Sequence, residues 1–284
     1  MDSQDQSVRA LDLLRQHCHA SATPGWHLEM GGRTQRSPRP IPSDQEIMRH
    51  ICVAIAYSQG ARSSQIGVII ETPVFKEAFA DFDPVALAQR KPNEILKKYW
   101  SRLGFFRFKG KIHQIVLCAK VLNEIARDHG SFGNHLKKFQ IPQRIRTTEH
   151  LDEFWRQFDV LQRDLQRRGM PFFRSTTSLL QLLLDLDFDT VKPDLIVMRL
   201  ARRLGIVGRE EGDRAFRECA RFLQTYSIGE SCRASELDLA LLAFGGQTGA
   251  SRLLTQRFCP PSDPCHHSAC PLGANGLCMA HNPV

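Results

Sequence analysis

The 284-residue sequence predicts an all-α protein, and three observations lead to this fold class. Apolar residues recur at three- and four-residue spacing in nearly every periodic segment. Signals that start helices, a capping box and prolines beside aspartates, accompany several of these segments. No segment shows the apolar–polar alternation that is typical of a half-buried strand.

The first expected element is a helix over about residues 7–18. Residues 21–42 are rich in Pro, Gly, Ser and Arg, so we interpret them as a linker or surface arm. The sequence SDQE at residues 43–46 is a capping box, which predicts that the next helix starts there. Another helix is expected to begin at Pro84, which follows Asp83.

Two long helices are predicted further along the chain, over residues 111–126 and 150–169. The second ends at a glycine, the residue type that most often follows a helix. An irregular stretch at about 140–147 separates the two helices. A further helix is expected to begin where Pro193 precedes Asp194.

The charge balance predicts a polyanionic partner. The formal net charge is +8 and the sequence pI is about 9.2, which favours nucleic acid over a membrane surface. No segment approaches the roughly 20 apolar residues that span a bilayer, and the N-terminal MDSQDQS lacks the features of a signal peptide. We therefore expect a monomeric cytoplasmic protein of bacterial type, associated with the nucleoid and not with a membrane.

Four of the nine cysteines lie in the C-terminal tail. Their spacing is Cys259-x5-Cys265-x4-Cys270-x7-Cys278. Disulfides are disfavoured in the cytosol, so this cluster predicts a metal site before a disulfide clasp or uncoordinated thiols. Four thiolates suit a [4Fe–4S] cluster or tetrahedral zinc equally by count.

Three segments occur in the order found in the helix-hairpin-helix DNA glycosylases and resemble that superfamily. They cover residues 54–84, 103–132 and 165–206. Within the third, the pattern KPD-x-x-V-x-R-x-x-x-RLG at 192–205 resembles the helix that carries the catalytic aspartate in endonuclease III and adenine DNA glycosylase. The sequence RRGMPFFRSTT at 167–177 is more similar to 3-methyladenine DNA glycosylase I.

The resemblance extends over about residues 45–278 and implies a two-lobe fold. A helical barrel with the helix-hairpin-helix would occupy residues 59–190. Residues 43–58 and 191–284 would form the second lobe, and residues 1–42 would form an N-terminal helix and flexible arm. The tail resembles that of endonuclease III, in which four cysteines hold a [4Fe–4S] cluster, so the resemblance favours iron–sulfur over zinc.

The resemblance also implies a DNA N-glycosylase that binds double-stranded DNA, flips a damaged or modified base out of the stack and excises it. Asp194 would be the catalytic carboxylate, because a carboxylate beside the sugar can stabilise the positive charge that develops there. Thr176 stands where bifunctional relatives carry a lysine, and threonine cannot form a Schiff base. We therefore expect a monofunctional enzyme that leaves an abasic site, without lyase activity.

The remaining candidate site residues fall into three groups. Gln59 and Leu103 match the positions that fill the gap left by the flipped base. The expected contacts to the DNA backbone come from Lys109, Arg174, Ser175, Thr176, Thr177, Lys192 and Arg199. Tyr57, Glu71 and Trp100 are candidates for the base pocket.

Other functions stay open at this point. The hairpin has MPFFR in place of the usual LPGVG, and the segment ICVAIAY lacks the glutamate that 3-methyladenine DNA glycosylase I has there. These departures leave room for a bulky modified base of foreign, phage DNA as the substrate. A non-catalytic, metal-bearing DNA-binding protein and a zinc-stabilised interaction protein are the further alternatives. The sequence does not identify the excised base.

Overall fold

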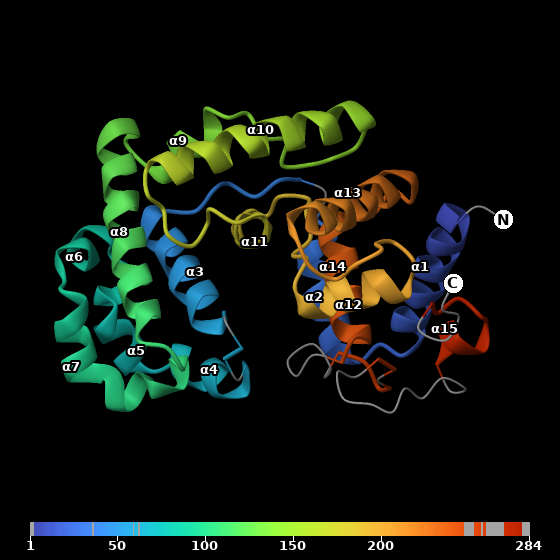
Figure 1. The fold of residues 1–284 in the computed structure, drawn as a ribbon, viewed down its shortest axis with the longest axis horizontal. Coiled ribbons are helices and arrows are strands. Elements are labelled where there is room, and N and C mark those ends of the chain that lie inside the picture. The colour runs from blue at the N-terminus through green and yellow to red at the C-terminus, as the bar shows by residue number, and fades with distance from the viewer. Residues whose placement is uncertain are drawn as a thin grey trace. The chain divides into compact units, whose positions relative to one another are not determined.

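The computed structural model describes residues 3–35, 37–58, 60–61, 63–246, 253–256, 258–259 and 270–279, and no strand forms among them (Figure 1). The only extended pairing in this part of the chain is an isolated antiparallel bridge between Ala22 and Leu254. The predicted all-α fold class is therefore confirmed. The predicted helices at 111–126 and 150–169 are present as α8, Gly110–His129, and α10, Thr148–Arg167.

The chain divides into two compact units. Unit 1 contains residues 1–38, 143–152 and 188–284, and unit 2 contains residues 39–142 and 153–187. The helices of unit 1 are α1 Ser3–Ala20, α2 Pro24–Arg33, α12 Leu195–Arg203, α13 Asp213–Gly229, α14 Ala234–Phe244 and α15 Pro271–Ala274. The helix α10 begins in unit 1 and continues in unit 2.

Unit 2 contains most of the remaining elements. They are α3 Asp44–Tyr57, α4 Ser63–Ile70, α5 Pro73–Ala78, the short η1 Ala80–Phe82, α6 Pro84–Gln89, α7 Pro92–Leu103, the short η2 Gly104–Phe106, α8, α9 Phe132–Lys137 and α11 Thr176–Asp185. The long helix α8 packs against α3, α6, α7 and α9, and α11 packs against α3. The apolar stripe of α8 that predicted this helix supplies much of the buried core of unit 2.

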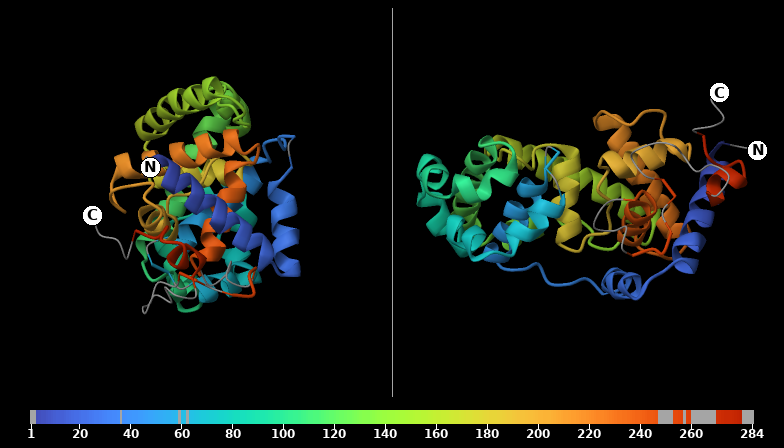
Figure 2. Two further views of the ribbon diagram at one scale, coloured as in Figure 1. Left: turned by 90° about the vertical axis from the view of Figure 1, so that its right-hand side faces the viewer. Right: turned by 90° about the horizontal axis from the view of Figure 1, so that it is seen from below.

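In unit 1, α14 is the central helix and contacts α1, α2, α12 and α13. Nearly all of its residues are buried, which agrees with its almost continuously apolar sequence ASELDLALLAF. The helix α15 lies beside α1, so segments from the first and last parts of the sequence pack together in this unit (Figure 2). Antiparallel backbone hydrogen bonds add to this contact, since Thr23 N donates to Leu253 O and Thr255 N donates to Ser21 O.

Helix α2 corrects the interpretation of residues 21–42 as a linker or arm. Pro24 takes the first helical position, and the side chains of Trp26 and Met30 are buried. These two residues are four apart and share one face, which explains why a short helix forms there despite its Pro and Gly content. Residues 43–58 also differ from the expected arrangement, because α3 packs against α8 and belongs to unit 2.

The expected helix starts are confirmed at three positions. Ser43 Oγ accepts a hydrogen bond from Glu46 N at 3.3 Å, at the start of α3. Asp83 Oδ1 accepts from Val85 N and Ala86 N, at the start of α6. Asp194 is the N-cap of α12. Each side chain thus satisfies backbone donors that the first helical turn leaves without intrahelical partners.

Candidate active site

The N-terminus of α12 places the predicted catalytic carboxylate. Oδ1 of Asp194 accepts hydrogen bonds from the backbone N–H groups of Ile196, at 2.9 Å, and Val197, at 3.1 Å. Two backbone donors hold this oxygen at the N-terminus of the helix, where the helix dipole interacts favourably with a negative charge. Because Pro193 has no N–H and fixes its own φ, the sequence KPD is well suited to start a helix at this aspartate.

The second carboxylate oxygen of Asp194 faces a lysine. Lys192 Nζ lies 3.9 Å from Oδ2, and the side chains of Lys192 and Asp194 are 32% and 20% exposed. Asp194 is therefore held through one oxygen while the side chain stays accessible. An accessible anion beside a cation suits a role next to a sugar–phosphate backbone, where the lysine can meet a phosphate.

The C-terminal half of α12 is tied to the cysteine-bearing tail. Arg203 Nη1 donates to Cys259 Sγ at 2.6 Å, and Arg203 O accepts from Met279 N at 2.7 Å. Arg199 Nη2 donates to Cys259 O at 3.0 Å and to Gly245 O at 3.1 Å. The guanidinium of Arg199 thus makes two hydrogen bonds inside unit 1, and its contact to the DNA backbone stays a prediction.

Three of the four tail cysteines are within the described residues, and Cys259, Cys270 and Cys278 are all buried in unit 1. Burial raises the pKa of the Cys259 thiol, while the charge of Arg203 opposes this effect. The fourth predicted ligand, Cys265, lies outside the described residues. Among the residues that the structure describes, no three His, Cys, Asp or Glu side chains are grouped to hold a metal ion. The donor set of four thiols still suits iron–sulfur or zinc.

The predicted hairpin contacts lie at the start of α11 in unit 2. Arg174 and Ser175 are exposed, and Ser175 Oγ caps the helix by accepting from Ser178 N. The Thr176 side chain is 1% exposed, and its hydroxyl accepts from Gln162 Nε2 at 3.4 Å. Thr176 is therefore much less accessible to a phosphate than Arg174, and both contacts to the DNA backbone stay predictions.

The two predicted gap-filling residues have different outcomes. Gln59 lies outside the described residues. Leu103 ends α7 with only 1% of its surface exposed. Leu103 is therefore part of the core in this structure, and its gap-filling role stays a prediction. Lys109 is exposed nearby in the sequence, with its Nζ 5.9 Å from the ring centroid of Trp100.

The base-pocket candidates are only partly brought together. Tyr57 is half-buried at the end of α3, and a Cβ on Gly67 would lie 3.3 Å from its hydroxyl oxygen. Burial raises the pKa of the Tyr57 phenol, and the negative charge of Glu71 adds to this effect, so these two residues lie near each other. Glu71 is exposed, however, and Trp100 is half-buried on α7.

Lys111 is a buried lysine that contacts the residues on both sides of the base-pocket candidate Tyr57, and the sequence analysis did not predict its burial. Its side chain is 1% exposed, and Nζ donates to Ala56 O at 2.9 Å and to Ser58 O at 2.6 Å. It therefore caps the C-terminus of α3 and holds the backbone that carries Tyr57. The available signal was its spacing, because Lys111 lies four residues before the buried Ile115 on the apolar stripe of α8.

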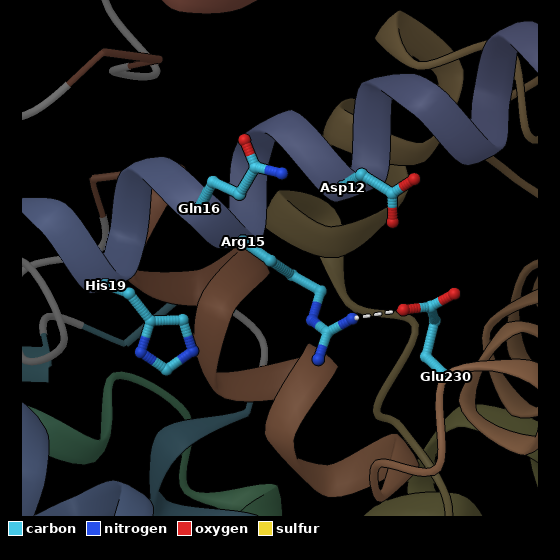
Figure 3. Close-up of a pocket in the computed structure, with 5 residues that line it drawn as sticks. All are labelled: Asp12, Arg15, Gln16, His19 and Glu230. Carbon is cyan, nitrogen blue, oxygen red and sulfur yellow. Dashed lines mark hydrogen bonds and ion pairs between the residues drawn. The ribbon is translucent and has the colours of Figure 1, made fainter.

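A surface hollow of about 590 Å³ lies in unit 1, between α1 and the end of α13 (Figure 3). Within it, Arg15 Nη1 lies 3.5 Å from Glu230 Oε2. None of the predicted site residues lines this hollow, so we do not connect it with base excision. Its lining residues are Asp12, Arg15, Gln16, His19 and Glu230.

Several solved structures are similar to this chain. A crystal structure of a mutant of 3-methyladenine DNA glycosylase I from Staphylococcus aureus is 18% identical, covers 60% of this chain and 90% of its own, and has a TM-score of 0.43. A second structure of this enzyme, on the recognition of 3-methyladenine, is 17% identical, covers 61% of this chain and 88% of its own, and has a TM-score of 0.42. A solution structure of 3-methyladenine DNA glycosylase I is 19% identical, covers 58% of this chain and 86% of its own, and has a TM-score of 0.43.

The family model for methyladenine glycosylase matches residues 39–182, just over half of the chain. This match contains the whole of unit 2 up to the middle of α11 and ends before Asp194. It confirms the predicted resemblance to DNA glycosylases, which was based on the ordered segments. The chain is a DNA glycosylase and belongs to the methyladenine glycosylase family.

Proposed function

We propose that this protein is a monofunctional DNA N-glycosylase that excises a flipped base and uses Asp194 as its catalytic carboxylate. The observation that carries the proposal is the geometry of Asp194. Two backbone N–H groups hold one oxygen at the N-terminus of α12, and the side chain remains one-fifth exposed. Family membership supplies the reaction class, and this arrangement supplies a residue suited to it.

The reaction breaks the bond between C1′ of the sugar and a nitrogen of the base. The electron pair of that bond leaves with the base, and positive charge develops on the sugar. The Asp194 carboxylate would stabilise this charge, orient a water molecule and accept a proton as the water oxygen bonds to C1′. The products are the free base and an abasic site.

An alkylated purine is the first candidate for the substrate. Such a base, 3-methyladenine among them, carries a positive charge in DNA and leaves without being protonated first, so the enzyme needs no acid in its base pocket. Tyr57 offers an aromatic face that attracts a cationic base.

A bulky modified base of foreign DNA is the second candidate. Two features favour it, namely the absence of the pocket glutamate and the replacement of the small hairpin glycines by MPFFR. Excision of such a base would need the same carboxylate chemistry but a larger pocket. Measurements on both classes of DNA therefore separate the two candidates without altering the proposed role of Asp194.

The proposal of monofunctional chemistry rests on the hairpin. A lyase needs an amine that attacks C1′ and forms a Schiff base. Position 176 is a buried threonine, and the hairpin sequence MPFFRSTTSLLQ contains no lysine. Borohydride trapping is expected to give no covalent enzyme–DNA adduct. A trapped adduct that maps to Lys192 would overturn this part of the proposal.

We further propose that Cys259, Cys265, Cys270 and Cys278 bind a metal, with a [4Fe–4S] cluster ahead of zinc. Support comes from the thiol donor set and from the burial of the three described cysteines in one unit. When bound, the metal would cross-link the tail and stabilise unit 1. Iron and zinc analysis with a visible absorption spectrum on anaerobically purified protein tests this proposal.

The decisive test is base release, detected by mass spectrometry, from a panel of duplexes. The panel contains methylated DNA, other lesions and DNA with bulky modified bases. Asp194→Asn is the matched control, because asparagine caps a helix about as well as aspartate but carries no charge. We expect this variant to bind DNA normally and to release base at least about 100-fold more slowly. Equal rates for the two proteins would overturn the proposed role of Asp194.

A further inference from the structure

A fully buried aspartate lies behind the turn that carries Asp194. The side chain of Asp238, in the centre of α14, is 1% exposed. Its Oδ1 accepts a hydrogen bond from the backbone N–H of Lys192 at 2.9 Å, and its Oδ2 accepts from Arg33 Nη1 at 3.1 Å. Each carboxylate oxygen therefore has a partner from a distant part of the chain, one from the KPD turn and one from α2.

A second hydrogen bond connects Lys192, which Asp238 holds, to Asp194. Asp194 N donates to Lys192 O at 2.7 Å, across Pro193, and Oδ1 of Asp194 then holds the first turn of α12. Proline offers no N–H, so the amide of Lys192 is the nearest backbone donor before Asp194 that an outside group can hold. Asp238 thus anchors the turn at this one available point.

Stability alone does not account for a charged pair in this place. A buried carboxylate is costly to desolvate, and well-packed apolar residues of similar size often do as well or better. Burial raises the pKa of Asp238, and the charge of Arg33 and the hydrogen bond from Lys192 N–H lower it. Arg33 also donates to Ser235 O at 2.8 Å, so its guanidinium is held in place beside the carboxylate.

We propose that Asp238 is a positioning residue that fixes the Lys192–Asp194 turn, and that Arg33 completes this support by neutralising its charge. This inference rests on the proposed function, in which Asp194 is the catalytic carboxylate. It assigns a role to α2, because Arg33 is the last residue of this helix. The helix lies outside the residues that match the methyladenine glycosylase family. The N-terminal segment would then be part of the catalytic apparatus of unit 1.

The test compares two double variants of the full-length protein. Asp238→Leu with Arg33→Met removes the acceptor for Lys192 N–H and leaves an apolar pair. Asp238→Asn with Arg33→Gln removes both charges but keeps an oxygen that can accept from Lys192 N–H. Three quantities are measured for each variant. They are single-turnover base release from methylated duplex DNA, the affinity for DNA, and amide hydrogen exchange of the peptide that contains Lys192.

A third variant controls for stability. Tyr226→Phe removes the hydroxyl that donates to Asp12 and accepts from Arg15 at 2.9 Å, all within unit 1 and remote in sequence from the KPD turn. It is expected to lower the melting temperature without slowing base release. A loss of rate in the leucine–methionine variant that is absent from this control cannot then be attributed to lower stability.

The leucine–methionine variant should release base about 100-fold more slowly, since a small misplacement of a catalytic group costs about this much. Its affinity for DNA should stay within about threefold, and the Lys192 amide should exchange faster. The asparagine–glutamine variant should keep both the rate, within about threefold, and the slow exchange.

Other outcomes overturn the inference. A normal rate in the leucine–methionine variant, together with an inactive Asp194→Asn protein, refutes the role of Asp238 and leaves the proposed function intact. Equal losses in both double variants, or in Tyr226→Phe, would mean that charge or stability matters instead of the hydrogen bond. Full activity of Asp194→Asn refutes the proposed function and, with it, the catalytic purpose of this support.

Discussion

Gly245, just after α14, approaches Ile196 of α12 more closely than any other residue type would allow. A Cβ on Gly245 would lie 2.3 Å from Cγ2 of Ile196 and 3.2 Å from Cδ1 of Leu200. The backbone of Gly245 also accepts a hydrogen bond from Arg199. The end of α14 therefore lies directly against the first turns of α12, the helix that Asp194 caps.

Gly245→Ala should therefore destabilise the protein by about 1–3 kcal/mol, because the added methyl group forces α12 and α14 apart. Differential scanning calorimetry measures the effect. Gly31→Ala is the matched control, since Gly31 is in helix α2 and a Cβ there would meet nothing within 4 Å. That change should be neutral or slightly stabilising. An unchanged melting temperature for Gly245→Ala would contradict the close packing.

Lys111 should make stability depend on pH in the alkaline range. Burial, with the nearby charge of Arg107, lowers the pKa of Lys111 to about 8, whereas an unfolded lysine titrates near its ordinary value of 10.5. Between these values the unfolded chain binds more protons than the folded one, so stability gains from this group as the pH rises. The neutral amine keeps two N–H donors, which match its two carbonyl acceptors.

The measurement is chemical denaturation of wild type and Lys111→Met at pH values from 7 to 10. Wild type should gain stability relative to the variant as the pH rises from about 8. Lys120→Met, at an exposed position of the same helix, serves as the control and should show no such trend. A constant difference between wild type and Lys111→Met would contradict the assigned burial of the amine.

Leu103→Ala should act on stability and not on base flipping. Leu103 is buried at the end of α7, so the truncation should cost about 2–5 kcal/mol in the free energy of unfolding. The rate of base release per folded molecule should stay close to that of wild type. Urea denaturation and single-turnover kinetics at low temperature test both points. A stable variant with a large loss of rate would support the gap-filling role.

The sequence was informative where structure depends on local pattern. The helix start at Asp194 could be predicted from KPD because a proline and a capping aspartate form a signal within three residues, whereas the proposed catalytic role came from the resemblance to other glycosylases. The relationship between Arg33 and Asp238 has no such signal, since the two residues are 205 positions apart. Helix α2 was missed because its apolar face contains only Trp26 and Met30 among prolines, glycines and arginines.

Burial was the other quantity that local pattern did not resolve. Leu103 and Thr176 occupy positions that resemble functional ones in related enzymes, but their neighbours enclose them. Whether a side chain at the end of a helix points to solvent or to the core depends on the packing of other helices. Lys111 is the opposite case, a charged residue type that is buried although its sequence suggests exposure. Its amine can be buried because carbonyl groups at the end of α3 accept its hydrogen bonds.

Removal of the proposed metal should loosen the C-terminal end of α12. Three hydrogen bonds tie this helix to the tail: Met279 N donates to Arg203 O, the Arg199 guanidinium donates to Cys259 O, and Arg203 Nη1 donates to Cys259 Sγ. If the four cysteines share a metal, Cys270→Ser should lose most of it, and the amides near Arg203 should exchange faster because the tail no longer fixes their partners. Metal analysis and hydrogen-exchange mass spectrometry measure the two effects together.

Cys232→Ser, at a half-buried cysteine outside the tail, is the control and should retain both the metal and the slow exchange. A Cys270→Ser protein with full metal content would remove this cysteine from the ligand set, and unchanged exchange after loss of the metal would show that the tail does not stabilise α12.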